Sequence, residues 1–470
     1  MCADKETNPL VQEEDQKDQA NNRIEKILNR IGFGVYQYLL LGVTGTGSFA
    51  DGAEVTIFSL VSFMLEDEWS LSTFQLGLMG GIIFGGMSLG YIIIGIYGDE
   101  WGRLEVVKYT YAALFLLGIA SALMPEFWSF IVLRGFAGVA ISMSVPPYIA
   151  LSVESCTTEQ RGAYVMIVEL LFGVGQIYIV LIAMWLAPNL ESDKWRELLI
   201  AAAIPIIIGI VFSMFVVESP LFSARKQRYS VASNSLEYIA KVNKKSPLNE
   251  EEYDNVYLTF PLHVERGPTR FSFLFDKTHK LTTLLLVCLW SCAIFSYYGL
   301  FYILPRLFGT DEEDSSVLYL ILIAIGAQCL ITLGSTYLID LPALGRKGTL
   351  ELSFFFLVLL SAASIPLADG FAIYVLVILI NSLNNSTFCM LYTYTSEVYE
   401  TELRELGFSV QNAIGRAATL FAPFVFTVLL DWTRAGPFIL LLITNGLMLV
   451  ATFLLPFETC GKFLDSSWTE

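Results

Sequence analysis

The chain has 470 residues, of which 55% are hydrophobic and 16% are charged, and its mean hydropathy is +0.60. Soluble domains usually carry about 25% charged residues, so this composition indicates an integral membrane protein. Asp and Glu outnumber Lys and Arg by 45 to 28, which argues against nucleic acid as a partner. The seven cysteines and two histidines form neither a metal-ligand spacing nor a disulfide framework, so we expect no metal and no cofactor.

The first 32 residues are polar and lack the apolar core of a cleaved signal peptide. We expect residues 1–37 to form a polar tail, disordered up to residue 19, and the first apolar segment to act as the targeting signal. Twelve apolar runs follow, each bounded by Gly, Pro or charged residues. They cover residues 38–65, 74–98, 106–124, 127–152, 163–187, 197–217, 280–304, 317–339, 349–367, 371–395, 407–430 and 437–455.

The connectors between these runs differ in basic residues. Those on the side of both termini hold 22 Lys and Arg, and those on the opposite side hold four. Basic residues concentrate on the cytoplasmic face of membrane proteins, so we expect both termini in the cytoplasm. We expect a monomer surrounded by lipid, in the plasma membrane or in an intracellular vesicle membrane.

A long polar interval, residues 218–279, divides the spans into two sets of six. Charged motifs repeat across this interval at an offset of 243 residues: Gly102-Arg103 recurs as Gly345-Arg346, Glu154 as Glu397, and Arg161 as Arg404. Glu218, after the sixth span, has a looser counterpart in Glu458. The sequence predicts an all-α membrane protein with duplicated six-helix bundles, residues 38–217 and 280–455, and a cytoplasmic tail, residues 456–470. Such an architecture is typical of transporters that bind solute where the halves meet.

Several motifs resemble a known family. GIYGDEWGR (residues 95–103) is similar to the cytoplasmic signature of the major facilitator superfamily, and VESPLF (217–222) and PFETCG (456–461) resemble its marks after spans six and twelve. FADGAEVTIFS (49–59), FSYYGLFYILPRLF (295–308) and SEVYETELRELGF (396–408) resemble the branch of synaptic vesicle glycoproteins and SVOP-like proteins. The resemblance implies the major facilitator fold. It also implies a pairing of the acids in the first span with Arg134.

Five charged residues fall inside the predicted spans: Asp51, Glu54, Arg134, Glu169 and Arg416. A charge at mid-depth costs roughly 2.5–3.5 kcal/mol on insertion scales, so we expect partners inside the bundle. Asp51 and Glu54 share one helix face, and Arg134 is a natural partner for either acid. The pair either fixes helix packing or takes part in transport, which we favour. Glu169 either joins this interior or extends its carboxylate to the cytoplasmic surface.

Arg416 has no acid in its own span. It either faces a cavity, where its guanidinium would bind a carboxylate solute, or reaches a carbonyl or Asp51 across the interface. Amides and aromatic rings in other spans are candidates to line the same site, although rings in spans more often serve packing. These candidates are Trp290, Tyr297, Tyr298, Asn381 and Asn384. Both histidines lie in the polar interval, so a coupled proton would be carried by Asp51 or Glu54.

Eight charged residues at predicted cytoplasmic helix ends are gating candidates, because charge pairs there can hold one face closed. Their alternative role is topology and solubility. They are Asp99, Arg103, Glu154, Arg161, Asp340, Arg346, Glu397 and Arg404.

The sequence therefore predicts a secondary transporter that moves a small organic solute by alternating access. Arg416 favours an organic anion, with protons as a coupled ion. The alternatives are an organic-cation carrier that uses Asp51 and Glu54, and a ligand-binding or regulatory membrane protein with the same fold. No set of nucleophile and base appears, so we do not expect an enzyme.

Overall fold

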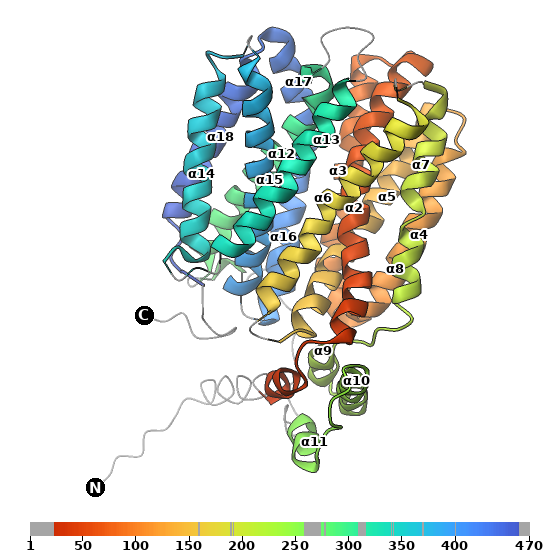
Figure 1. Cartoon of the computed structure of the whole chain (residues 1–470), viewed down its shortest axis with the longest axis vertical. Coiled ribbons are helices and arrows are strands. Elements are labelled where there is room, and N and C mark those ends of the chain that lie inside the picture. The colour runs from red at the N-terminus through yellow and green to blue at the C-terminus, as the bar shows by residue number, and fades with distance from the viewer. Residues whose placement is uncertain are drawn as a thin grey trace.

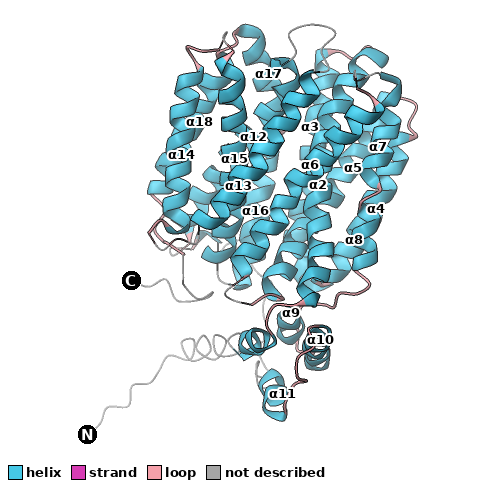
Figure 2. Cartoon of the chain, in the orientation of Figure 1, coloured by secondary structure: helices cyan, strands magenta, loops and turns pink. Residues whose placement is uncertain are grey.

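The computed structural model of the chain describes residues 23–157, 160–188, 190, 192–257, 274–276, 279–308, 316–339, 341, 343–368, 371–399 and 401–459. Within these residues every regular element is a helix (Figure 2). In the described part of the chain, twelve helical segments are long and apolar enough to cross a membrane. The predicted fold class and number of spans are therefore confirmed. Most of the predicted tail, residues 1–22, lies outside the described residues, whereas residues 23–31 are helical.

The first half contains α2 (Val35–Glu68), α3 (Thr73–Trp101), α4 (Arg103–Ala122), α5 (Phe127–Glu154), α6 (Arg161–Leu186), the short η1 (Ser192–Lys194), α7 (Trp195–Ala203) and α8 (Ile206–Phe212). The second half contains α12 (Lys280–Phe308), α13 (Ser316–Leu338), α14 (Gly345–Ser364), α15 (Ala372–Val398), α16 (Thr401–Thr419), α17 (Ala422–Trp432) and α18 (Gly436–Phe453). The two halves lie side by side (Figure 1).

Two spans that the sequence predicts as continuous helices are interrupted. The sixth divides into α7 and α8 at Pro205, and the eleventh divides into α16 and α17 just before Pro423. Proline lacks a backbone N–H and clashes with the preceding turn, but it fits the first turn of a new helix. Each break therefore restarts the helix at the proline, which is a local signal that hydropathy alone does not resolve.

Glycine allows α2 and α6 to pack backbone against backbone. A Cβ on Gly52 would lie 2.0 Å from the carbonyl oxygen of Phe172, and one on Gly175 would lie 2.0 Å from that of Phe49. Close approach at small residues is how membrane helices gain packing energy. The contact holds α2 and α6 together at the depth of Asp51.

The described part of the interval between the halves includes the α-helices α9 (Pro220–Arg225), α10 (Tyr229–Val242) and α11 (Glu250–Tyr257). They lie below the bundle at the end where α2 begins and α8 ends (Figure 1). The helical segment 23–31 lies beside them. This end carries the repeated charged motifs.

Candidate functional site

Glu54 and Arg134 form a closed ion pair inside the first half. The Nη1 atom of Arg134, on α5, lies 2.7 Å from Oε2 of Glu54, on α2. Ser121 of α4 accepts two further hydrogen bonds, from Nε at 3.1 Å and from Nη2 at 2.8 Å. Arg134 is 0% exposed and Glu54 is 3% exposed. Of the two acids that the sequence offers to Arg134, the structure pairs it with Glu54.

Asp51, three residues earlier on α2, faces the other half of the molecule. Its Oδ2 lies 3.8 Å from Nη2 of Arg416 on α16. The guanidinium carbon of Arg416 also lies 4.7 Å from the ring centre of Tyr298 on α12, an arrangement in which the ring attracts the cation. Arg416 is buried, and two of its nitrogens, Nε and Nη1, have no hydrogen-bond partner within the described chain. The same holds for Oδ1 of Asp51.

Glu169 of α6 belongs to this interior and does not reach the surface. It is 4% exposed, and its Oε1 has no hydrogen-bond partner among the described residues. It interacts electrostatically with both Asp51 and Arg416. Of the two predicted positions for Glu169, the structure therefore selects the buried one. Asn384 of α15 is 1% exposed, and neither atom of its amide group is bonded within the described chain.

A ring of neutral hydrogen bonds joins the halves beside these charges. The hydroxyl of Tyr297 accepts from Nε2 of Gln176 at 3.2 Å and donates to Oε1 of Gln328 at 3.2 Å. Gln328 donates in turn to Gln176 at 2.8 Å, and Asn381 donates to Gln328 at 3.3 Å. Gln176 lies on α6 in the first half, whereas the other three lie on α12, α13 and α15. All four side chains are 0% exposed.

Gln176 and Gln328 were not among the predicted site residues, although the amides Asn381 and Asn384 were. Each glutamine is an uncharged polar residue in a strongly apolar helix. A single amide residue in an apolar span was therefore the sequence feature that could have identified both glutamines.

Trp290 of α12 has a structural environment within the second half. Its indole N–H donates to Oγ1 of Thr395 at 2.9 Å, and its ring packs against Phe388, Tyr392 and Phe408. The structure therefore brings Tyr297, Tyr298, Asn381 and Trp290 into the second half's core, but only the first three lie beside the polar groups described above.

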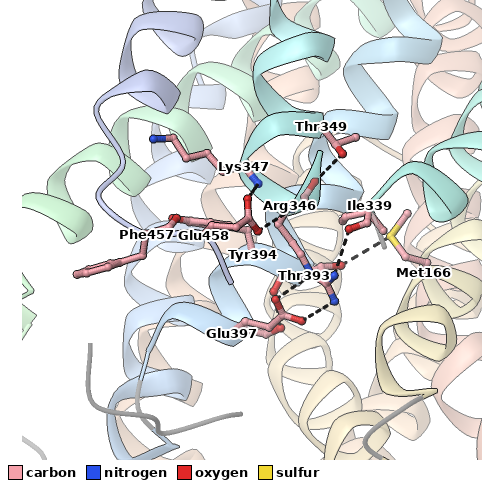
Figure 3. Close-up of polar contacts among 12 residues, drawn as sticks. Met166, Ile339, Arg346, Lys347, Thr349, Thr393, Tyr394, Glu397, Phe457 and Glu458 are labelled. Atoms are coloured by element: carbon pink, nitrogen blue, oxygen red, sulfur yellow. Dashed lines mark hydrogen bonds and ion pairs between the residues drawn. The ribbon is translucent and has the colours of Figure 1, made fainter. Parts of the chain in front are cut away.

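Three charged residues of the second half, Arg346, Glu397 and Glu458, form one cluster (Figure 3). Arg346 donates to both carboxylate oxygens of Glu397, at 3.1 and 3.2 Å, and to the carbonyl of Ile339 at 3.1 Å. Glu458 accepts from the backbone N–H groups of Arg346 at 2.8 Å and Lys347 at 2.9 Å. A carboxylate at the start of a helix is stabilised by these free N–H groups and by the helix dipole.

The first half repeats part of this scaffold. Arg103 donates to the carbonyl of Gly98 at 3.1 Å and lies 4.5 Å from the ring centre of Phe222. Glu218 accepts from the backbone N–H of Leu104 at 3.1 Å, and burial raises the pKa of its carboxyl. Glu154 accepts from the hydroxyl of Ser219, the N-cap residue of α9, at 2.5 Å. The charged residues of the first half are thus bonded to α9, in the polar interval between the halves.

Of the remaining gating candidates, Arg161 is paired with Glu25 at 2.9 Å and donates to the carbonyl of Val153 at 3.0 Å. Asp340 and the side chains of Asp99 and Arg404 lie outside the described residues. Within the described part of the chain, no group of three His, Cys, Asp or Glu side chains could hold a metal ion.

The model of the Major Facilitator Superfamily matches residues 43–423. The chain belongs to the major facilitator superfamily. It is therefore a multi-pass membrane protein of a transporter family, and this membership indicates a transporter rather than an enzyme.

Curated relatives confirm the resemblance to the SVOP-like branch. The putative transporter svop-1 of Caenorhabditis elegans is 27% identical over 465 residues, covering 94% of this chain and 87% of the relative. The synaptic vesicle 2-related protein of Bos taurus is 28% identical over 472 residues, with 94% and 82% covered. The putative transporter SVOPL of Mus musculus is 26% identical over 486 residues, with 96% and 95% covered.

Solved structures show the same fold. The proton:xylose symporter XylE bound to 6-bromo-6-deoxy-D-glucose matches with a TM-score of 0.71 at 17% identity, covering 92% of this chain and 98% of that chain. A partially occluded inward-open form of XylE from E. coli matches with a TM-score of 0.70 at 16% identity, with 91% and 100% covered. At such low identity the likeness concerns the fold alone.

Proposed function

We propose that this protein is a secondary transporter that binds a small organic solute between its two halves and moves it by alternating access. The observation that carries the proposal is the contact between Asp51 of the first half and Arg416 of the second. This contact joins the two bodies that must separate and close during transport. Its 3.8 Å separation and unfilled hydrogen-bonding positions suit groups that exchange partners.

The buried atoms without partners support a solute site at this place. Leaving a buried polar atom unbonded costs about 1–3 kcal/mol, and more when the atom is charged. Within the described residues such atoms come from both halves: Asp51 and Glu169 in the first, and Arg416 in the second. A polar solute that bonds to them would recover this cost and draw the halves together.

We propose an organic anion as the solute, because Nε and Nη1 of Arg416 have no hydrogen-bond partner within the described chain. Each of them forms a fork that suits a carboxylate together with Nη2, the nitrogen that faces Asp51. An anion would weaken the hold of Arg416 on Asp51. A proton on Asp51 would then neutralise the remaining carboxylate, which makes proton symport the natural coupling. XylE, which shares this fold, is a proton:xylose symporter, and its coupling supports proton symport as the proposal.

An organic cation is the second candidate, and a specific observation favours it. Two acids, Asp51 and Glu169, lie close to Arg416, and Glu54 is already neutralised by Arg134. The interior around Arg416 therefore carries an excess of one negative charge when all groups are ionised. A cation would balance this excess, as would a proton.

Counterflow in proteoliposomes distinguishes these candidates. Vesicles loaded with an unlabelled carboxylate should accumulate the labelled form, and matched amines should not. The Asp51→Asn variant should bind the anion but lose the pH dependence of uptake. Accumulation of amines alone would favour the cation carrier. Binding in a thermal-shift assay without accumulation of any solute would identify a ligand-binding protein that does not transport.

We further propose that both termini and the helices α9–α11 lie in the cytoplasm, because connectors on that side hold 22 of the basic residues. The host membrane is proposed to be a vesicle or plasma membrane, with the protein as a monomer in lipid. Protease protection of an N-terminal tag in sealed vesicles tests the orientation.

A further inference from the structure

Asn243, just after α10, makes hydrogen bonds to the start of the first membrane span. Its Oδ1 accepts from the backbone N–H of Tyr36 at 2.8 Å, and its Nδ2 donates to the carbonyl of Gly32 at 3.1 Å and to Oε1 of Gln37 at 3.0 Å. A Cβ on Gly34 would lie 2.6 Å from this side chain, so glycine is needed for the approach. The polar interval between the halves, which we call the linker, is therefore bonded to the beginning of α2, the helix that carries Asp51 and Glu54.

Ser246 lies three residues beyond Asn243 in the irregular segment 245–249, which is exposed apart from Leu248. Its Oγ accepts a hydrogen bond from Nη1 of Arg30 at 2.8 Å, and its carbonyl accepts from the same nitrogen at 3.3 Å. The guanidinium of Arg30 also pairs with Glu252, at 2.5 Å from Nε and 2.9 Å from Nη2. Arg30, Ser246 and Glu252 thus join the helical segment 23–31 to the linker, and we call them the clasp.

The sequence around Ser246 has the features of a substrate for a proline-directed kinase. Pro247 follows the serine and disfavours helical backbone at it, so the segment can be presented in extended form. Lys244 and Lys245 precede it and are exposed. Among the described residues the Ser246 hydroxyl accepts a hydrogen bond from Arg30 and donates none, so its own proton is available for removal.

We propose that Ser246 is a phosphorylation site and that Arg30 receives the phosphate. The kinase transfers the γ-phosphoryl group of ATP. A bond forms between phosphorus and Oγ of Ser246, the bond from phosphorus to the β,γ-bridging oxygen breaks, ADP leaves with that electron pair, and the hydroxyl proton passes to the catalytic base of the kinase.

The residues of the clasp are placed so that Arg30 can bind a phosphate on Ser246. A phosphoserine carries about −1.5 to −2 charges at pH 7 and three acceptor oxygens, whereas Glu252 carries one charge. Arg30 already lies within hydrogen-bond distance of Ser246 Oγ, so its fork transfers from Glu252 to the phosphate with little movement. Lys244 and Lys245 add attraction, and the helical segment 23–31 is held more firmly against the linker.

The first test is modification of the intact protein in lipid nanodiscs by a proline-directed serine/threonine kinase with ATP. Intact mass should rise by one phosphate per chain, and peptide mapping should place it on Ser246. Ser246→Ala and Pro247→Ala should each remove this phosphate, and both positions are exposed, so the fold should be retained. Phosphorylation of a synthetic peptide covering residues 240–252 without phosphorylation of the intact protein would overturn the proposal, as would equal incorporation in Ser246→Ala.

The second test asks whether the phosphate acts through the clasp. Hydrogen exchange of residues 23–37 should slow by about tenfold on phosphorylation, which is the effect of one strong charge-assisted hydrogen bond. Arg30→Gln should accept the phosphate equally well but show no slowing. Identical exchange before and after phosphorylation in the wild type would refute the role of Arg30. Neither test depends on transport activity, so both remain decisive if the proposed function fails.

Discussion

Two buried arginine–carboxylate pairs start from the same helix and differ in almost every respect. Glu54 and Arg134 lie 2.7 Å apart, and Ser121 accepts two more hydrogen bonds from the arginine. Asp51 and Arg416 lie 3.8 Å apart, with two guanidinium nitrogens and one carboxylate oxygen unbonded in the described chain. The first pair is internal to one half, and the second joins the two halves.

We propose that Glu54 and Arg134, for which the sequence favoured a role in transport, form a structural pair, and that Asp51 and Arg416 form the functional one. Helices α2, α4 and α5 hold Glu54, Ser121 and Arg134 within one bundle, so a rigid rotation of the halves leaves their contacts unchanged. Asp51 and Arg416 lie on opposite bodies, so the same rotation makes or breaks their contact. A buried pair with all its bonds made fixes geometry, whereas one with open positions has room for a ligand or a proton.

Removing Arg134 should have the largest effect on folding. Arg134→Ala leaves the Glu54 carboxylate buried without a partner, a loss that costs about 3–5 kcal/mol. We expect aggregation or a large fall in the unfolding temperature, measured by size-exclusion chromatography and thermal unfolding in detergent. The double variant Glu54→Leu with Arg134→Met removes both charges and should recover most of the stability. A stable Arg134→Ala protein would show that the pair is not the structural one.

Altering Arg416 should instead affect transport with little effect on folding. Arg416→Lys keeps the charge facing Asp51 but loses the planar fork that binds a carboxylate. We expect uptake of an anionic solute to fall by about tenfold to a hundredfold, corresponding to one charge-assisted hydrogen bond. The exposed Arg434 provides the matched control, Arg434→Lys, which should transport normally. Unchanged uptake in Arg416→Lys would remove Arg416 from the proposed site.

The sequence predicted that Arg134 pairs with one of the two acids of α2, but it left the partner of Arg416 open. Spacing places Asp51 and Glu54 on one helix face, and the cost of buried charge requires partners for both. However, the choice between Arg134 and Arg416 depends on how α2 is rotated against two different neighbours. That rotation is set by the backbone contacts at Gly52 and Gly175, which are long-range packing and leave no periodic signal.

The number of spans and the repeated charged motifs at the helix ends were predictable for a related reason. Each span is a long apolar run that must satisfy its backbone within one helix, so local composition determines it. The motifs at Arg103 and Arg346 keep their offset because the two halves repeat one scaffold. The sequence named Tyr297 and Asn381 but not their partners Gln176 and Gln328, because the four residues of the ring come from four different helices.

A third variant weakens the pair of Glu54 and Arg134 without removing either charge. Ser121→Ala deletes the acceptor of two Arg134 hydrogen bonds and leaves Glu54 in place. An unsatisfied buried donor costs about 1–3 kcal/mol, so we expect a clear fall in unfolding temperature and a smaller effect than in Arg134→Ala. Ser129→Ala, at an exposed hydrogen bond of α5, is the control and should change stability by less than about 0.5 kcal/mol. Equal stability of Ser121→Ala and the wild type would mean that the pair does not need Ser121.

The smallest effect should come from a pair that is also internal to one half but reaches water. Arg346 and Glu397 are bonded through both carboxylate oxygens, yet their side chains are 10% and 21% exposed. Partial exposure weakens the Coulomb attraction, so Glu397→Gln, which keeps an acceptor, should cost about 1 kcal/mol or less. Salt screens such charges, so the difference in unfolding temperature between wild type and variant should shrink from 50 to 500 mM KCl. A loss as large as that of Arg134→Ala, unchanged by salt, would mean that burial does not decide which pairs hold the fold, and the contrast between the two membrane pairs would lose its physical basis.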